Sequence, residues 1–190
     1  MADDIISVSV VVNAPVERVW PLLVEHIEVS RSQAQESLQS DPPGPPVAGQ
    51  VIHMEPAFLR IRMHVDRVAP LDPPMTGETV YAKMSFFSIE GNMVSRLSRD
   101  VEHYHFQAQG EIKHPWFHLT GCTDMRCIAT DTTSCTIQHI ERSELNIRLI
   151  PHWMARILNS DKTVKKATAD GIEKSLQEVK VKAERGQDEW

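Results

Sequence analysis

The strongest constraint on the fold is a change in the spacing of apolar residues near position 150. Between residues 50 and 147, apolar and polar residues alternate in short runs, most clearly over residues 59–66, and this alternation is typical of half-buried β-strands. Over residues 151–185, apolar residues recur every three or four positions, which predicts one long amphipathic helix. Consecutive strands joined by short turns favour an antiparallel sheet, and the helix must cover the apolar face of that sheet.

The N-terminal part predicts a strand followed by helical segments. Residues 5–13 alternate between aliphatic residues and serines, as a half-buried strand does. In the helix that follows, Pro15 suits the first turn and Pro21 kinks or shortens the helix. Residues 28–40 are polar and predict a short second helix on the surface. Residues 40–49 contain four prolines and two glycines, which exclude a helix or central strand and predict a stiff loop.

These elements predict an α+β protein with the element order β-α-α-β6-α. We expect a curved antiparallel sheet of about seven strands that grips the long C-terminal helix. The whole chain, residues 1–190, is expected to form a single domain, with a frayed tail at residues 186–190. A sheet that curls around a helix is difficult to fill with side chains alone, so we expect a cavity between the sheet and the helix.

Charge and composition exclude several functional classes. The formal net charge is −6 and the pI is near 5.8. Because nucleic-acid-binding domains usually carry a basic face, nucleic acid is not expected as a partner. No apolar stretch approaches the roughly 20 residues that span a bilayer, so no integral membrane segment is expected. Three cysteines are an odd number, and the sequence start lacks the basic and apolar regions of a secretion signal. Both features favour the reducing cytoplasm.

The segment VSVVVNAPVERVWPLL resembles the opening of the SRPBCC superfamily. The matching positions are an alternating strand followed by Ala14, Pro15, Glu17, Val19 and Trp20. The C-terminal segment ELNIRLIPHWMARIL and the helix after it also resemble this superfamily. The resemblance implies a START-like helix-grip fold with a hydrophobic cavity between helix and sheet. Members of the superfamily are carriers, cyclases, dehydratases or regulators, so this fold does not fix one function.

One carboxylate of the predicted C-terminal helix lies on or beside its apolar stripe. Asp161 has this position, where a carboxylate is costly to desolvate unless a cationic partner or water meets it. His53, His64 or His139 of the sheet could be that partner. A histidine and a carboxylate facing one apolar cavity would form an acid–base pair, because burial moves both pKa values toward neutrality. The alternative is that Asp161 is an ordinary residue of the helix surface.

Methionine and aromatic side chains are numerous enough to line an apolar cavity. Methionine is flexible and polarizable, and it suits pockets that adapt to varied apolar ligands. Each residue taken alone could equally fill the core, and the resemblance favours the binding interpretation for the set. The candidate ligand-binding residues are Trp20, Met54, Met63, Tyr81, Met84, Phe86, Tyr104, Phe106, Phe117, Met125, Trp153 and Ile157.

A metal site is not expected. His103 and His105 would share one face of a strand, which is a metal-ligand spacing, and His114 and His118 follow nearby. Strand histidines on a solvated face are usually ordinary polar residues, however, and Pro115 breaks the helical spacing of the second pair. The cysteines lack the C-x2-C spacing of a zinc knuckle, and we expect them to be small buried side chains.

The sequence therefore predicts a binding protein, with an enzyme as the alternative. The binding hypothesis is a cytoplasmic protein that holds a hydrophobic small molecule or lipid between the sheet and the C-terminal helix. The alternative is a cyclase or dehydratase that uses a cavity histidine and carboxylate as acid and base on a polyketide-like or other carbonyl substrate. No cofactor is expected, because no glycine-rich nucleotide loop or HExxH motif is present. A homodimer and contact of the C-terminal helix with an anionic membrane stay open.

Overall fold

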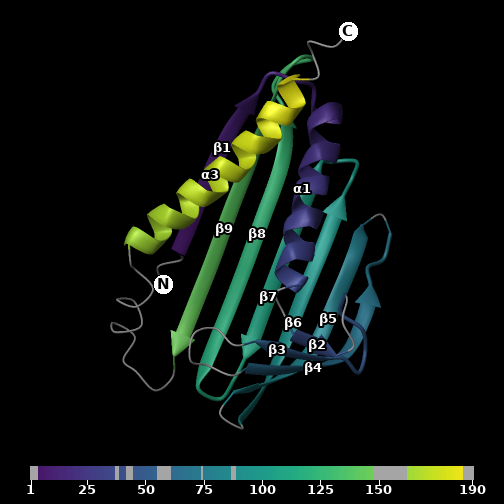
Figure 1. The fold of residues 1–190 in the computed structure, drawn as a ribbon, viewed down its shortest axis with the longest axis vertical. Coiled ribbons are helices and arrows are strands. Elements are labelled where there is room, and N and C mark those ends of the chain that lie inside the picture. The colour runs from purple at the N-terminus through teal and green to yellow at the C-terminus, as the bar shows by residue number, and fades with distance from the viewer. Residues whose placement is uncertain are drawn as a thin grey trace.

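The computed structural model describes residues 4–36, 39–41, 45–54, 61–73, 75–86, 89–147 and 162–185. Its strands join one antiparallel sheet in the order β1-β9-β8-β7-β6-β5-β4-β3-β2, and two helices lie on one face of that sheet (Figure 1). The elements are β1 (Asp4–Val12), α1 (Val16–Glu36), β2 (Gln39–Asp41), β3 (Val51–Met54), β4 (Ile61–Pro70), β5 (Thr76–Phe86), β6 (Ile89–Asp100), β7 (His105–Lys113), β8 (Phe117–Ala129), β9 (Cys135–Ile147) and α3 (Lys162–Arg185).

The predicted α+β class and the curved antiparallel sheet with a C-terminal helix are confirmed. The long strands β7, β8 and β9 run side by side, and β2, β3 and β4 run across their lower ends, so that the sheet curls toward the helices (Figure 1). The sheet has nine strands instead of about seven. One of the additional strands is β2, which pairs with β3 through Ser40 and Ile52. Its three residues have no apolar alternation that would have predicted a strand.

A single helix replaces the two helices expected between β1 and the proline-rich loop. α1 continues through Pro21 and through most of the polar segment expected to form a second helix. Pro21 is exposed, so the carbonyl that loses its hydrogen-bond partner can bind water instead. Two ion pairs hold the second half of α1 over β5 and β6, and they join Arg31 to Glu78 and Arg99 to Glu28.

The described part of the proline-rich loop joins β2 to β3 within the same sheet. Gly49 lies at a φ of +86°, a backbone conformation that glycine adopts without strain. Its N–H donates to the carbonyl of Val65 over 2.8 Å, and the carbonyl of Gln50 accepts from the Val65 N–H over 2.9 Å. The side chain of Gln50 is fully buried. These contacts fix the end of the loop against β4.

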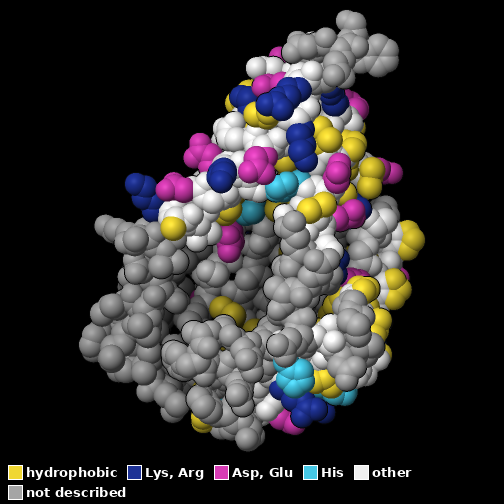
Figure 2. Space-filling view, in the orientation of Figure 1, with side chains coloured by type: hydrophobic (Ala, Val, Ile, Leu, Met, Phe, Trp, Pro, Cys, Tyr) yellow, Lys and Arg dark blue, Asp and Glu magenta, His cyan; other side chains and the backbone are white. Residues whose placement is uncertain are grey.

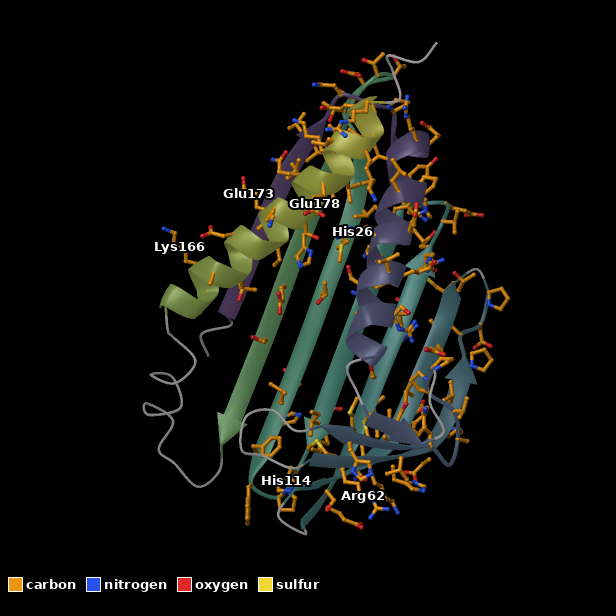
Figure 3. The ribbon with its side chains drawn as sticks, viewed as in Figure 1. His26, Arg62, His114, Lys166, Glu173 and Glu178 are labelled. Carbon is orange, nitrogen blue, oxygen red and sulfur yellow. The ribbon has the colours of Figure 1, made fainter. Side chains whose placement is uncertain are left out.

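Helix α3 covers one end of the sheet face. Its apolar stripe, with Leu176, Val179 and Ala183, is buried against β1 and α1, as predicted for the C-terminal helix. His26 of α1 and Ser175 of α3 share a hydrogen bond, which joins the two helices. Figure 3 labels His26 on α1. The first part of the expected helix, residues 151–161, lies outside the described residues. Neither α1 nor the described part of α3 combines the length and apolarity needed to cross a bilayer.

The described apolar residues form two separate clusters instead of one continuous core. The larger cluster packs α1 and α3 onto β1, β9, β8 and β7, with Leu23 and Ile137 among its fully buried members. The smaller cluster lies where the sheet curls, on β3, β4 and β5, and it includes Val65 and Ala82. A band of the helix-side face therefore separates two packed regions.

Candidate functional site

Burial decreases steadily along the helix-side face of β9. Ile137 is fully buried and His139 is 7% exposed. Glu141 is half-buried and Ser143 is exposed. Because alternate residues of a strand point to the same face, these four side chains all point toward the helix side. The cover provided by α1 and α3 therefore ends beyond His139.

The neighbouring strands lose their cover at the same level. On β8, Cys127 is buried, whereas Met125 and Thr123 are half-buried. On β7, Phe106 is buried, whereas Ala108 is half-buried. The register aligns these residues in cross-strand rows, with Met125 opposite His139 and Thr123 opposite both Ala108 and Glu141. The half-buried residues therefore form one continuous area of the sheet.

Two glycines lie in the middle of this area. Gly110 of β7 and Gly121 of β8 are directly opposite each other. A Cβ atom added to either glycine would point to the helix side and would meet no atom of the described residues within 4 Å. Since both φ values lie outside the left-handed region, the backbone does not require glycine here. The glycines leave open space above the sheet.

We call this area the helix-side hollow. Its residues share a helix-side position between the two apolar clusters and incomplete burial. In Figure 2 the surface is recessed below α3, and hydrophobic side chains are visible at the bottom of the recess. The residues that define the hollow are Met93, Ser95, Gly110, Ile112, Leu119, Gly121, Thr123 and Glu141.

His139 lies at the inner end of the hollow. Its Nε2 atom is buried and has no hydrogen-bond partner among the residues that the structure describes. Its cross-strand neighbours on this face are Val8 and Met125, both apolar. Burial lowers the pKa of His139, because the charged imidazolium is disfavoured away from water. A neutral imidazole with one unused nitrogen can accept or donate a hydrogen bond to a polar group of a guest.

The lowered pKa of His139 gives an expected pH dependence of stability. The unfolded chain protonates this histidine near pH 6.5, whereas the folded protein does so only at lower pH. As the pH falls below about 6.5, the free energy of unfolding should therefore decrease, by at most about 1.4 kcal/mol per pH unit for this group. The decrease should stop once the pH is below the folded pKa. Urea unfolding at several pH values should show a shallower slope for His139→Gln than for the natural protein, and equal slopes would contradict this account.

Two of the predicted ligand-binding residues lie beside the hollow. Met125 is half-buried and faces His139. Phe117 begins β8 on the same face, and its ring stacks on His114, with the ring centroids 4.7 Å apart. Contact of these two residues with a ligand stays a prediction.

Five predicted ligand-binding residues serve packing in the structure. They are all buried or held against the clusters, so none presents a free face to the hollow. Trp20 is 5% exposed and meets Tyr104 edge to face, with the ring centroids 6.0 Å apart. Phe106 belongs to the larger cluster, Met63 belongs to the smaller one, and Met84 is 2% exposed. Core packing is the interpretation that these positions support.

Three predicted residues lie on the opposite face of the sheet. His53 and His64 are exposed there, and His64 is 3.4 Å from Asp66. Tyr81 also points away from the helices, with the Arg67 guanidinium 4.2 Å from its ring centroid. These residues cannot meet a carboxylate or ligand on the helix side. Neighbouring residues of a strand point to opposite faces of the sheet. Because Met63 and Val65 point to the helix side, His64 between them points away from it.

The remaining predicted site residues lie outside the described part of the structure. The backbones of Met54 and Phe86 belong to β3 and β5, but their side chains are not described. Trp153, Ile157 and Asp161 precede the described part of α3. The proposed pairing of His139 with Asp161 therefore stays a prediction.

The four histidines with metal-ligand spacing have different partners in the structure. His103 lies in the turn before β7 and is 2.8 Å from Asp100. His105 is 2.9 Å from Asp124, and His118 is 2.9 Å from Glu111. His114 is buried beside Phe117. Among the described residues, no three histidine, cysteine or acidic side chains come together as metal ligands.

Two of the three cysteines are buried as expected for small apolar side chains, whereas Cys122 is half-buried on the opposite face of the sheet. Cys127 and Cys135 are buried in the larger cluster. Desolvation raises the pKa of Cys127 to about 12, and the neighbouring Cys135 adds to this effect. Desolvation also raises the pKa of Cys135. A thiol with a raised pKa is a weak nucleophile because little thiolate forms at neutral pH.

Sequence reasoning missed the small residues that create the hollow. Ser95, Gly110, Gly121 and Thr123 are neither methionine nor aromatic, so a search for apolar lining residues passed over them. A glycine in the interior of a predicted strand was the available signal, because such glycines often mark a place where something approaches the backbone closely.

The chain matches no protein-family model and no curated protein sequence. Solved structures align with nearly its whole length at low similarity. The Zhui aromatase/cyclase from Streptomyces sp. R1128 has 14% identity and a TM-score of 0.47, covering 97% of this chain and 95% of that one. A point mutant of norcoclaurine synthase from Thalictrum flavum has 14% identity and a TM-score of 0.40, covering 93% and 96%. A START superfamily protein from Mycobacterium smegmatis has 10% identity and a TM-score of 0.38, covering 94% and 99%.

These similarities assign no residue of this chain a role. The fold is defined by the chain's own elements, namely the opening strand and helix, the antiparallel sheet and the C-terminal helix. They form the α+β helix-grip arrangement that the resemblance to the SRPBCC superfamily implied.

Proposed function

We propose that this protein binds an apolar small molecule or lipid in the helix-side hollow. The observation that carries the proposal is the open space above Gly110 and Gly121, between two apolar clusters. Burying apolar ligand surface there would contribute roughly 25 cal/mol per Å2. Met93, Ile112 and Leu119 are half-buried apolar side chains of this face that a guest would cover.

Polar groups of the hollow would orient the guest. His139 offers a buried nitrogen without a partner, and Glu141 and Thr123 follow along the same face. Pockets for small molecules commonly combine an apolar lining with a few such groups, which set the direction of binding. A guest with an apolar body and one hydroxyl or carbonyl group would use both features.

Acid–base catalysis is the second candidate function. His139 and Glu141 are alternate residues of β9 on the same face, so their Cα atoms are about 7 Å apart. The pKa of His139 is lowered by burial, which keeps the imidazole neutral and able to take a proton at neutral pH. The neutral imidazole of His139 could take a proton from the carbon beside the carbonyl group of a bound substrate. The imidazolium formed could then return this proton to the oxygen that leaves, while the carboxylate of Glu141 accepts a hydrogen bond from a substrate hydroxyl. This arrangement favours dehydration or cyclisation of a carbonyl compound.

Native mass spectrometry of the freshly purified protein tests the binding proposal. We expect a population with added mass that organic solvent releases and that can be identified in the extract. Incubation with a neutral apolar fluorophore such as N-phenyl-1-naphthylamine should displace this mass and give bound fluorescence. A protein without added mass that also fails to bind the fluorophore would contradict the proposal.

The His139→Gln variant separates binding from catalysis. A binding protein should carry the same extracted molecule in the variant and in the natural protein, with little loss of affinity for N-phenyl-1-naphthylamine. A catalyst should instead carry a different molecule in the variant, namely the unconverted substrate. For a dehydratase the two molecules would differ by one water.

A further inference from the structure

The sheet face directed away from α1 and α3 carries a groove of about 590 Å3. The groove crosses β5 to β9, and the side chains of its central part include Tyr81, Val94 and Cys122. The backbone of Gly110 and Gly121 also lines it. Thr79, Gln109 and Thr120 line the groove as well, so its lining is mixed, and the body of a small organic molecule could rest on the apolar part of it.

Two arginines lie at opposite sides of this groove. Arg96 of β6 and Arg142 of β9 belong to one cross-strand row, with Gln109 and Cys122 between them. At about 4.8 Å per strand, their Cα atoms are about 14 Å apart. Arginine side chains are long and flexible, so both guanidinium groups can lean over the row and meet one ligand. Neither arginine forms an ion pair with a described residue.

The acidic residues of the groove leave an excess of positive charge. Glu111 is held by Lys113 over 3.0 Å and by His118 over 2.9 Å, so its charge already has partners. Glu144 lines the groove and forms no ion pair with a described residue. With respect to the described residues, the groove therefore contains two guanidinium groups and one carboxylate that are not in ion pairs. This balance favours a ligand with a single negative charge, because Glu144 would repel a second one.

We propose that this groove binds a small organic carboxylate. Its apolar body would rest on Val94 and Cys122, and its carboxylate would lie between Arg96 and Arg142. Arginine is suited to this role because the planar guanidinium matches a carboxylate in two-point hydrogen bonding. The site lies on the other side of the sheet from the helix-side hollow and does not depend on the function proposed for the hollow.

An NMR titration with 1-naphthoate tests this proposal. The amide signals of Val94, Thr120 and Cys122 and the methyl signals of Val94 and Thr120 should shift and saturate. Arg96→Gln and Arg142→Gln should each weaken binding about tenfold or more, as expected for loss of a charged hydrogen bond. Arg62→Gln is the matched control, because Arg62 is an exposed arginine of the same sheet face outside the groove. It should leave the affinity unchanged.

The neutral analogue 1-naphthylmethanol separates charge recognition from apolar contact. It should bind at least about tenfold more weakly than 1-naphthoate, because it cannot pair with either guanidinium. Equal affinity of the two compounds would overturn the proposal. Unchanged 1-naphthoate affinity in both arginine variants, shifts confined to helix-side residues, or no saturable shift at millimolar 1-naphthoate would also overturn it.

Discussion

Gly121→Val is expected to weaken the binding of a neutral apolar guest at least about tenfold, because the valine side chain would occupy the space that the guest needs. A Cβ at this position meets no atom of the described part of the chain within 4 Å, and the residue opposite it is Gly110. The fold should tolerate the change. Valine is favoured over glycine in strands by up to about 1 kcal/mol. The measurement is a fluorescence titration with N-phenyl-1-naphthylamine, together with the free energy of unfolding in urea.

Thr120→Val is the matched control for this experiment. Thr120 is the preceding residue of β8 and faces the opposite side of the sheet. This variant adds the same side chain to the same strand but leaves the helix-side hollow open, so its affinity for the fluorophore should equal that of the natural protein. If Gly121→Val bound the fluorophore as well as Thr120→Val does, the guest would not lie in the hollow.

Gly77→Ala is expected to lower the free energy of unfolding by about 3 kcal/mol or more, through backbone strain and a steric clash together. Gly77 has a φ of +140°, which side chains rarely allow. An added Cβ would lie 2.0 Å from the carbonyl oxygen of Leu97, which belongs to the neighbouring strand β6. Relief of this clash requires movement of the backbone of β5 or β6. Urea unfolding followed by circular dichroism measures the loss.

Gly110→Ala provides the comparison for the Gly77 variant. Gly110 is also in the interior of a strand, but its added Cβ would meet nothing within 4 Å. Its free energy of unfolding should stay within about 1 kcal/mol of the natural protein, with any change being favourable. Equal losses for the two alanine variants would show that the geometry at Gly77 does not cause the effect.

The fold could be predicted from periodicity where one face of a strand is clearly apolar. Val8, Val10 and Val12 of β1 and Met63 and Val65 of β4 face the helix side, as their alternation indicates. The strand β2 could not be predicted in this way, because it is short, polar and stabilised only by pairing with β3. The pattern of apolar residues before β2 likewise did not predict that α1 continues through Pro21 to Glu36 as a single helix.

The candidate site was predictable only in part. The burial of His139 follows from its place on the apolar face of β9, and the sequence interpretation named it. Tyr81 was included among the ligand-binding residues because it is aromatic. It lies between Val80 and Ala82, which point to the helix side, so its own side chain points to the opposite face. The pairing of Gly110 with Gly121 and the row that joins Arg96 to Arg142 depend on the register between distant strands. No local pattern in the sequence specifies that register.

Intermolecular NOEs between N-phenyl-1-naphthylamine and methyl-labelled protein test the central claim most directly. The strands supply matched pairs of neighbours on opposite faces, Met93 with Val94 and Leu119 with Thr120. If the guest occupies the helix-side hollow, its protons should give NOEs to the methyl groups of Met93 and Leu119 and not to those of Val94 and Thr120. NOEs to Val94 and Thr120 alone, or saturable binding without NOEs to any of the four, would contradict the claim.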